Sequence, residues 1–145
     1  MEKVLILSGS KSDDGIVEKA TKVFEAFGID YKYEVASAHR NPEKVDELVS
    51  QTSAQVIIAV AGLSAALPGV VAARTIKPVI GVPVNAALGG LDSLLSVVQM
   101  PPNIPVASVG IDNAKNAALL AIEILALNDH ELKVKLQEFR EKLKE

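Results

Sequence analysis

The sequence contains no cysteine and no tryptophan, and it has only two histidines, His39 and His130. Without cysteine the chain can form no disulfide, no thiolate nucleophile and no zinc–cysteine site. Neither histidine has carboxylates around it at the spacing of metal ligands, so no metal site is predicted. A Gly-x-Ser-x-Gly nucleophile elbow is also missing, which disfavours a serine hydrolase.

Long apolar runs are absent as well. No run reaches the length of a transmembrane helix, and the apolar part of the N-terminal segment, Val4–Leu7, is too short for a signal peptide. The net charge is only -3, with acidic and basic residues interspersed. That balance argues against a nucleic-acid partner and against electrostatic attachment to a membrane. We therefore expect a cytoplasmic protein.

Aliphatic residues are plentiful where aromatic residues are scarce: hydrophobic residues make up 49% of the 145-residue chain and aromatic residues 3%. This composition favours an α/β protein, because buried parallel strands read as continuous apolar runs. The length predicts one domain, residues 1–145. The mean hydropathy of +0.28 is high for a lone small domain. It indicates either a well-filled core or a surface that other subunits cover.

Strand and helix patterns alternate along the chain, as repeated βα units require. Five runs are predicted as strands: Val4–Leu7, Tyr31–Ala36, Gln55–Ala61, Pro78–Val84 and Val106–Gly110. This order predicts right-handed crossovers and a three-layer α/β/α sandwich around a central, mostly parallel sheet.

Helix boundaries are marked by capping residues. Gly28 is placed to end the first helix, and Asn41 followed by Pro42 to begin the second. A very apolar helix is expected at residues 113–127. Asp129 is expected to cap a C-terminal helix whose apolar stripe is Leu132, Leu136, Phe139 and Leu143.

Polar or small residues follow three of the predicted strands, at the edge where ligands bind in open parallel sheets. The segments are Gly9–Asp13, Ser37–Arg40 and Ala61–Gly69. We expect all three to converge on one crevice.

The first segment, Gly9-Ser10-Lys11-Ser12-Asp13, suits a phosphate group. Gly9 permits unusual backbone conformations, the serines supply hydroxyls, and the helix that follows presents free N–H groups. Asp13 has the wrong charge for phosphate but can accept hydrogen bonds from ribose hydroxyls. The alternative is that Ser12 or Asp13 merely caps the helix.

The second segment, Ser37-Ala38-His39-Arg40, combines a titrating group with a cation. A histidine has an unperturbed pKa near neutrality, and an arginine fork matches a phosphate in bidentate fashion. The alternative is that both side chains are ordinary surface residues, as we expect for His130.

The third segment is rich in small residues, among them Ala61, Gly62, Ser64 and Ala66. Small side chains let a planar ligand approach the backbone closely. The alternative is tight packing of a helix against the sheet.

Together these segments resemble the PurE family, whose members form 4-carboxy-5-aminoimidazole ribonucleotide in de novo purine biosynthesis. The resemblance covers nearly the whole chain. The matching segments are Gly9–Asp13, Ser37–Arg40, Ala66–Gly69, Pro78–Val84, Asp92–Pro101 and Asn116–Ala121. The resemblance implies a flavodoxin-like fold of the PurE type.

The resemblance also implies roles. Ser10, Ser12 and Arg40 would hold the phosphate, Asp13 the ribose, and His39 would be the general acid/base. The full set of substrate-binding residues would be Gly9, Ser10, Ser12, Asp13, Ser37, Ala38, Arg40, Ala61, Gly62, Ser64 and Leu67. The family uses no metal and no organic cofactor. It forms homo-octamers in which the C-terminal region packs against neighbouring subunits, and its small-molecule partners are a ribonucleotide and CO2.

The family has two branches. A mutase moves the carboxylate of N5-carboxyaminoimidazole ribonucleotide to ring carbon C4, whereas a carboxylase uses aminoimidazole ribonucleotide and CO2 directly. Arg40, Pro68 and the segments Gly81–Val84 and Gln99–Pro101 look like the mutase branch. The mutase branch usually carries a second histidine at the position of Ala66, and the stretch around Ala66 looks more like the carboxylase branch.

We therefore predict a mutase, with direct carboxylation as the alternative. Two remoter readings are a PurE-like paralogue acting on another nucleotide and a non-catalytic nucleotide-binding module. The retained His39 argues against the module. The single compact domain argues against the paralogue, because such relatives tend to have longer chains.

Overall fold

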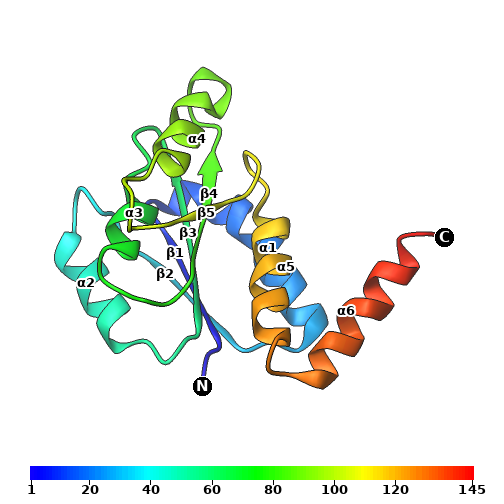
Figure 1. Ribbon diagram of the computed structural model, residues 1–145. Coiled ribbons are helices and arrows are strands. Elements are labelled where there is room, and N and C mark those ends of the chain that lie inside the picture. The colour runs from blue at the N-terminus through cyan, green and yellow to red at the C-terminus, as the bar shows by residue number, and fades with distance from the viewer.

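Five parallel strands form the centre of the molecule, and a computed structural model describes them together with all other residues from 1 to 145 (Figure 1). The strands are β1 (Val4–Ser8), β2 (Tyr31–Val35), β3 (Val56–Gly62), β4 (Val79–Val84) and β5 (Ala107–Ser108). Their order in the sheet is β2-β1-β3-β4-β5, and every neighbouring pair is parallel. The carboxyl ends of all strands therefore lie along one edge.

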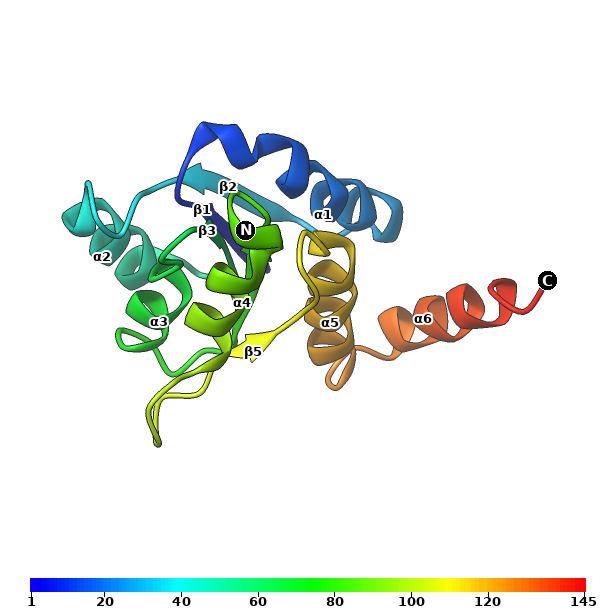
Figure 2. The ribbon, with the colours of Figure 1, turned by 90° about the horizontal axis from the view of Figure 1, so that it is seen from above.

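Helices cover both faces of this sheet. They are α1 (Asp14–Phe27), α2 (Pro42–Gln51), α3 (Leu67–Ala72), α4 (Leu91–Val98), α5 (Ala114–Ala126) and α6 (His130–Lys142). Seen from above, α1 and α5 lie on one face, while α2, α3 and α4 lie on the other (Figure 2). The predicted three-layer sandwich is confirmed. The predicted C-terminal helix is α6, which packs against the core on the α1 and α5 side through Leu132, Leu136 and Phe139, while its C-terminal end extends away from the molecule (Figure 1).

Each face of the sheet has its own core because side chains alternate along a strand. Val4 and Ile6 of β1 pack with the apolar side chains of α1 and α5 in one cluster of 22 buried residues. Leu5 and Leu7 point the other way, into a cluster of 15 buried residues that includes side chains of α2, α3 and α4. Burial on both faces explains why the strands read as unbroken apolar runs.

The predicted capping residues act at helix ends. Gly28 ends α1 in the left-handed region, with φ of 70°, where glycine costs little. The side chain of Asn41 accepts a hydrogen bond from the N–H of Lys44 at the start of α2. Asp129 does the same for the N–H of Leu132 at the start of α6. The start of α5 is capped by Asn113 in the same manner.

Three details of the prediction are wrong. Strand β5 keeps only two of the five predicted residues, because it pairs with β4 alone and the chain turns away soon after Val109. The segment predicted as a loop from Ala61 to Gly69 is loop only in its middle, since β3 extends to Gly62 and α3 begins at Leu67. Leu143 lies beyond α6 and is 66% exposed rather than packed.

The structure contains no helix with the length and apolarity that a membrane crossing requires.

Candidate functional site

A pocket of about 540 Å³ opens at the carboxyl edge of β1, β2 and β3. It brings together every site residue predicted from the sequence: Gly9, Ser10, Ser12, Asp13, Ser37, Ala38, His39, Arg40, Ala61, Gly62, Ser64 and Leu67. The expected convergence of the three segments on one crevice is therefore what the structure contains. The remaining lining residues are Leu63, Ala65, Ala66 and Ala86.

The first wall is the turn from Gly9 to Asp13. The N–H of Gly9 donates to the Val60 carbonyl at 3.1 Å, so the turn continues the pairing of β1 with β3. The Ser10 hydroxyl oxygen accepts from the N–H of Ser12 at 3.2 Å and from its hydroxyl at 2.9 Å. These bonds gather the two serine hydroxyls at the mouth of the pocket. Neither Ser12 nor Asp13 provides a side-chain cap for α1, so the simple capping alternative does not describe them.

The second wall is the turn Ser37–Arg40, which is bonded to the first. Arg40 Nη2 donates to the Gly9 carbonyl oxygen at 2.7 Å. The backbone N–H of Arg40 donates to Ser37 Oγ at 3.1 Å, which fixes the turn itself. Arg40 thus holds its positive charge against the backbone of the Gly9–Asp13 turn, in the pocket that Ser10 and Ser12 also line. A guanidinium has five N–H donors, so one bond to Gly9 leaves donors free for an anion.

Asp13 is the one charged residue that is buried in the pocket wall, with 8% of its surface exposed. Loss of solvation raises the pKa of its carboxyl, and the nearby negative charges of Asp14 and Asp112 raise this pKa further. No lysine or arginine forms an ion pair with it. The fold therefore keeps a costly acceptor in the pocket, which is typical of a group retained for binding.

The third wall runs from Gly62 to Leu67 and is mostly apolar. A Cβ on Gly62 would lie 3.2 Å from Ala86 Cβ and 3.4 Å from Val84 Cβ, so glycine is what lets this wall approach β4 closely. Leu63 is 55% exposed and has φ of 55°, which is unusual for a residue with a side chain. Its carbonyl accepts from the N–H of Ala65 at 2.8 Å, closing a tight turn.

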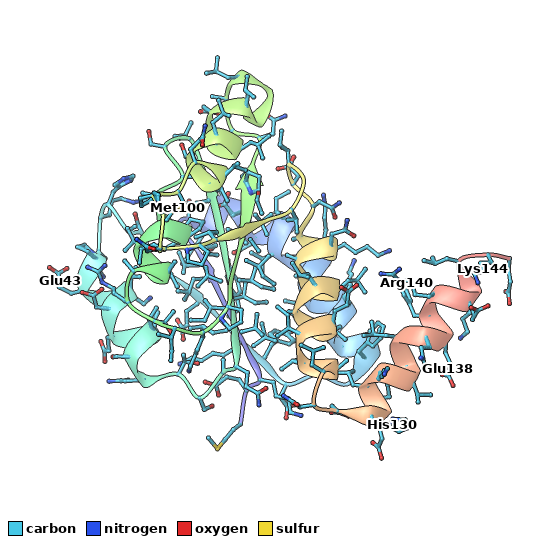
Figure 3. All side chains as sticks on the ribbon, in the orientation of Figure 1. Glu43, Met100, His130, Glu138, Arg140 and Lys144 are labelled. Atoms are coloured by element: carbon cyan, nitrogen blue, oxygen red, sulfur yellow. The ribbon has the colours of Figure 1, made fainter.

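The two histidines lie in different parts of the molecule. His39 is exposed and lines the pocket, on the turn that also carries Arg40. His130 begins α6, as Figure 3 shows, and it does not line the pocket. The one lining residue outside all three predicted segments is Ala86, which follows β4. Its position after a strand was its only signal, since an alanine carries no chemistry of its own.

The profile of the AIR carboxylase family matches residues 3–145. The chain belongs to this family. The N5-carboxyaminoimidazole ribonucleotide mutase of Methanocaldococcus jannaschii is 59% identical over 141 residues, which are 97% of this chain and 90% of that protein. The enzyme of the same name from Escherichia coli is 49% identical over 144 residues, 95% of this chain and 85% of that protein.

The fold agrees with this membership. The crystal structure of Treponema denticola PurE superimposes with a TM-score of 0.85 at 32% identity, covering 97% of this chain and 90% of that one. The resemblance to the PurE family is thereby confirmed. Ala66, which the resemblance places where the mutase branch usually carries a histidine, lines this pocket.

Proposed function

We propose that this chain moves the carboxylate of N5-carboxyaminoimidazole ribonucleotide to ring carbon C4 and so forms 4-carboxy-5-aminoimidazole ribonucleotide in purine biosynthesis. The observation that carries the proposal is the meeting of Arg40, two serine hydroxyls, buried Asp13 and His39 in one pocket. The mutase names of relatives up to 59% identical support it. We place the activity in the cytoplasm.

The polar end of the pocket fits a ribose phosphate. Arg40 supplies a fixed positive charge, and Ser10 and Ser12 supply hydroxyl groups in the same pocket. Asp13 accepts hydrogen bonds from the ribose hydroxyls. These bonds replace the hydrogen bonds to water that the carboxylate loses on burial. The nucleotide is held at this end, and its base then extends toward the Gly62–Leu67 wall.

The apolar wall fits the base and CO2. Ala61, Ala65 and Leu67 are buried and offer no group that competes for the reacting atoms. A dry surface of this kind keeps the released CO2 beside the ring and excludes water from the reaction.

His39 balances the protons of the reaction. The bond from the exocyclic nitrogen to the carboxylate breaks, CO2 leaves, and the nitrogen gains one proton. Ring carbon C4 then attacks CO2, a carbon–carbon bond forms, and C4 loses one proton to restore aromaticity. One general acid/base can give the first proton and take the second, ending as it began. His39 is the one lining residue that carries an imidazole, and we assign it this role.

A second candidate reaction uses aminoimidazole ribonucleotide and CO2 directly. Ala66 favours it, because the pocket has no second histidine at this position. The same C4 attack on CO2 and the same proton transfer to His39 would then follow without the initial nitrogen–carbon cleavage.

Self-association is part of the proposal. Leu88, Leu91, Leu95 and Val98 form a stripe of exposed apolar side chains along α4 and the turn before it, between 49% and 79% exposed. The spacing of Leu91, Leu95 and Val98 places these three side chains on one face of α4, and Leu88 lies in the turn that precedes it. We assign this stripe to contacts between subunits of a homo-octamer.

The His39→Asn variant tests the acid/base role. We expect kcat to fall about 10²–10⁴-fold, the range that general acid/base catalysis supplies, while KM changes little. Steady-state kinetics with N5-carboxyaminoimidazole ribonucleotide measures both constants. The matched control is His130→Asn, which removes the other histidine from an exposed helix end and leaves turnover unchanged. If His39→Asn keeps most of its turnover, His39 is not the acid/base.

A further inference from the structure

A chain of hydrogen bonds lies behind the Gly9–Asp13 turn. Ser8 ends β1 and is fully buried, and its hydroxyl oxygen lies 2.8 Å from that of Tyr33. The Tyr33 hydroxyl donates to Asp14 Oδ1 at 2.5 Å. Ser8 Oγ lies 3.2 Å from the Ser10 carbonyl oxygen. These contacts connect Ser10 within the turn with Asp14, the first residue of α1 after it.

The register of the sheet places this chain on one side. Ile6 of β1 pairs with Tyr33 of β2, and Ser8 pairs with Val35. Ser8 points the same way as Val4 and Ile6, toward the core under α1, because strand side chains alternate. Ser8, Tyr33 and Asp14 do not line the pocket. They contact the turn from the side that faces the core, away from the pocket.

Proton counting fixes the direction of the bonds. Tyr33 has one hydroxyl proton, which it donates to Asp14. The single proton of Ser8 is therefore shared between the Tyr33 oxygen and the Ser10 carbonyl. Loss of solvation and the bond to Asp14 raise the pKa of Tyr33 to about 12. The phenol keeps its proton, and hence this bond, throughout the neutral range.

The connection reaches the pocket through Ser10. The Ser10 carbonyl accepts from the N–H of Asp13 at 3.1 Å as well as from Ser8. The Ser10 hydroxyl oxygen accepts hydrogen bonds from the N–H and the hydroxyl of Ser12. Fixing Ser10 and Asp14 therefore orients the two serines and Asp13 that face the pocket.

We propose that Tyr33 is a positioning residue that, with Ser8 and Asp14, holds the Ser10–Asp13 turn in the conformation that receives a ribose phosphate. This inference rests on the proposed binding of a ribonucleotide at that turn. Holding the turn before binding removes an ordering cost that the ligand would otherwise have to offset. The role is specific to affinity, because Tyr33 touches no reacting atom.

A purely structural role for Tyr33 makes a different prediction, and Tyr31 provides the comparison. Tyr31 lies on the same face of β2, and its hydroxyl donates to Glu25 Oε1 of α1 at 3.0 Å. Both tyrosines thus join β2 to a carboxylate of α1. Only Tyr33 does so at the end of α1 that borders the pocket.

The experiment compares Tyr33→Phe with Tyr31→Phe, each of which loses only a hydroxyl. Calorimetry with aminoimidazole ribonucleotide gives Kd, kinetics with the N5-carboxylated substrate gives kcat and KM, and thermal unfolding gives Tm. We expect Tyr33→Phe to raise Kd and KM about fivefold to tenfold, with kcat nearly unchanged, as loss of one charge-assisted bond in the support would do. We expect the two variants to lower Tm by similar amounts, because each loses one hydrogen bond between β2 and α1. Tyr31→Phe should leave Kd unchanged.

Two further variants make each outcome decisive. Ser8→Ala breaks the connection between Tyr33 and Ser10 while leaving the tyrosine itself unchanged, and we expect it to raise Kd as well. It replaces Tyr33→Phe as the test if that variant does not fold. Arg40→Ala removes the proposed phosphate contact and raises Kd independently of Tyr33.

Equal Kd values for Tyr33→Phe and Tyr31→Phe overturn the positioning role. A wild-type protein that binds the nucleotide without turning it over contradicts the proposed reaction alone, and one that does not bind it overturns both.

Discussion

At the scale of single residues, chemical type and position after a strand were enough to predict the groups that line the pocket. His39, Arg40 and Asp13 are polar residues in turns, and the sequence alone indicated them. Tyr33 could not be predicted in this way, because it sits in a strand and alternates like a core residue. Its bond to Asp14 depends on how α1 packs on β2, which only the three-dimensional structure fixes.

The burial of Asp13 leads to a prediction about stability. Its folded-state pKa is raised above the unfolded value, chiefly by loss of solvation. The ionised carboxylate therefore destabilises the fold at neutral pH, and this cost decreases as pH falls below the folded-state pKa and is gone below the unfolded-state pKa. Asp13→Asn should raise Tm at pH 7 and weaken binding of the ribonucleotide, because an amide accepts fewer hydrogen bonds. The Tm difference between variant and wild type should shrink as pH is lowered. Unfolding scans across pH test this, and an unchanged or lower Tm at pH 7 contradicts it.

At the scale of elements, apolar runs and capping residues predicted the strands and most helix ends, whereas close packing could not be predicted. Gly81 reads as one more residue of a strand. In the structure, a Cβ at this position would lie 2.4 Å from Val97 Cγ1 of α4 and 3.2 Å from Pro68 Cγ of α3. Both helices lie directly on β4 at this glycine. Such a contact joins segments distant in sequence, and no local pattern reports it.

Gly81→Ala tests this close approach. The added methyl group has to displace Val97, which is 1% exposed, so we expect a loss of about 1–3 kcal/mol in the free energy of unfolding. Denaturant titration measures the loss. The matched control is Gly15→Ala in α1, where nothing lies within 4 Å of the new Cβ and the change should stabilise the helix by up to about 1 kcal/mol. Equal stability of the two variants would refute the packing argument.

At the scale of the whole molecule, the mean hydropathy indicated either a well-filled core or an apolar surface that other subunits cover, and it could not say where such a surface would lie. The structure locates it: α4 buries Ser93 and Val97 while Leu91, Leu95 and Val98 remain exposed. Ser93 donates to the carbonyl of Val84 at 2.7 Å, which fixes the rotation of α4 and so decides which face points outward. Periodicity alone could not separate the covered face from the exposed one, because apolar residues lie on both.

Leu95→Glu tests whether copies of the chain meet at this face. A charge buried at a subunit contact is costly, so we expect the variant to have a much smaller mass than the wild-type protein in light scattering. The control is Gln51→Glu, which adds the same charge on an exposed position of α2 and leaves the mass unchanged. An octameric Leu95→Glu protein would show that subunits do not associate through α4.

The most direct measurement of the central claim compares product formation from two substrates at physiological CO2. One reaction starts from N5-carboxyaminoimidazole ribonucleotide, the other from aminoimidazole ribonucleotide with bicarbonate and CO2. The account predicts a clear preference in kcat/KM for the N5-carboxylated substrate, with Ala66 compatible with mutase chemistry. Efficient carboxylation of aminoimidazole ribonucleotide, with no advantage for the N5-carboxylated substrate, would contradict it and make this chain a carboxylase.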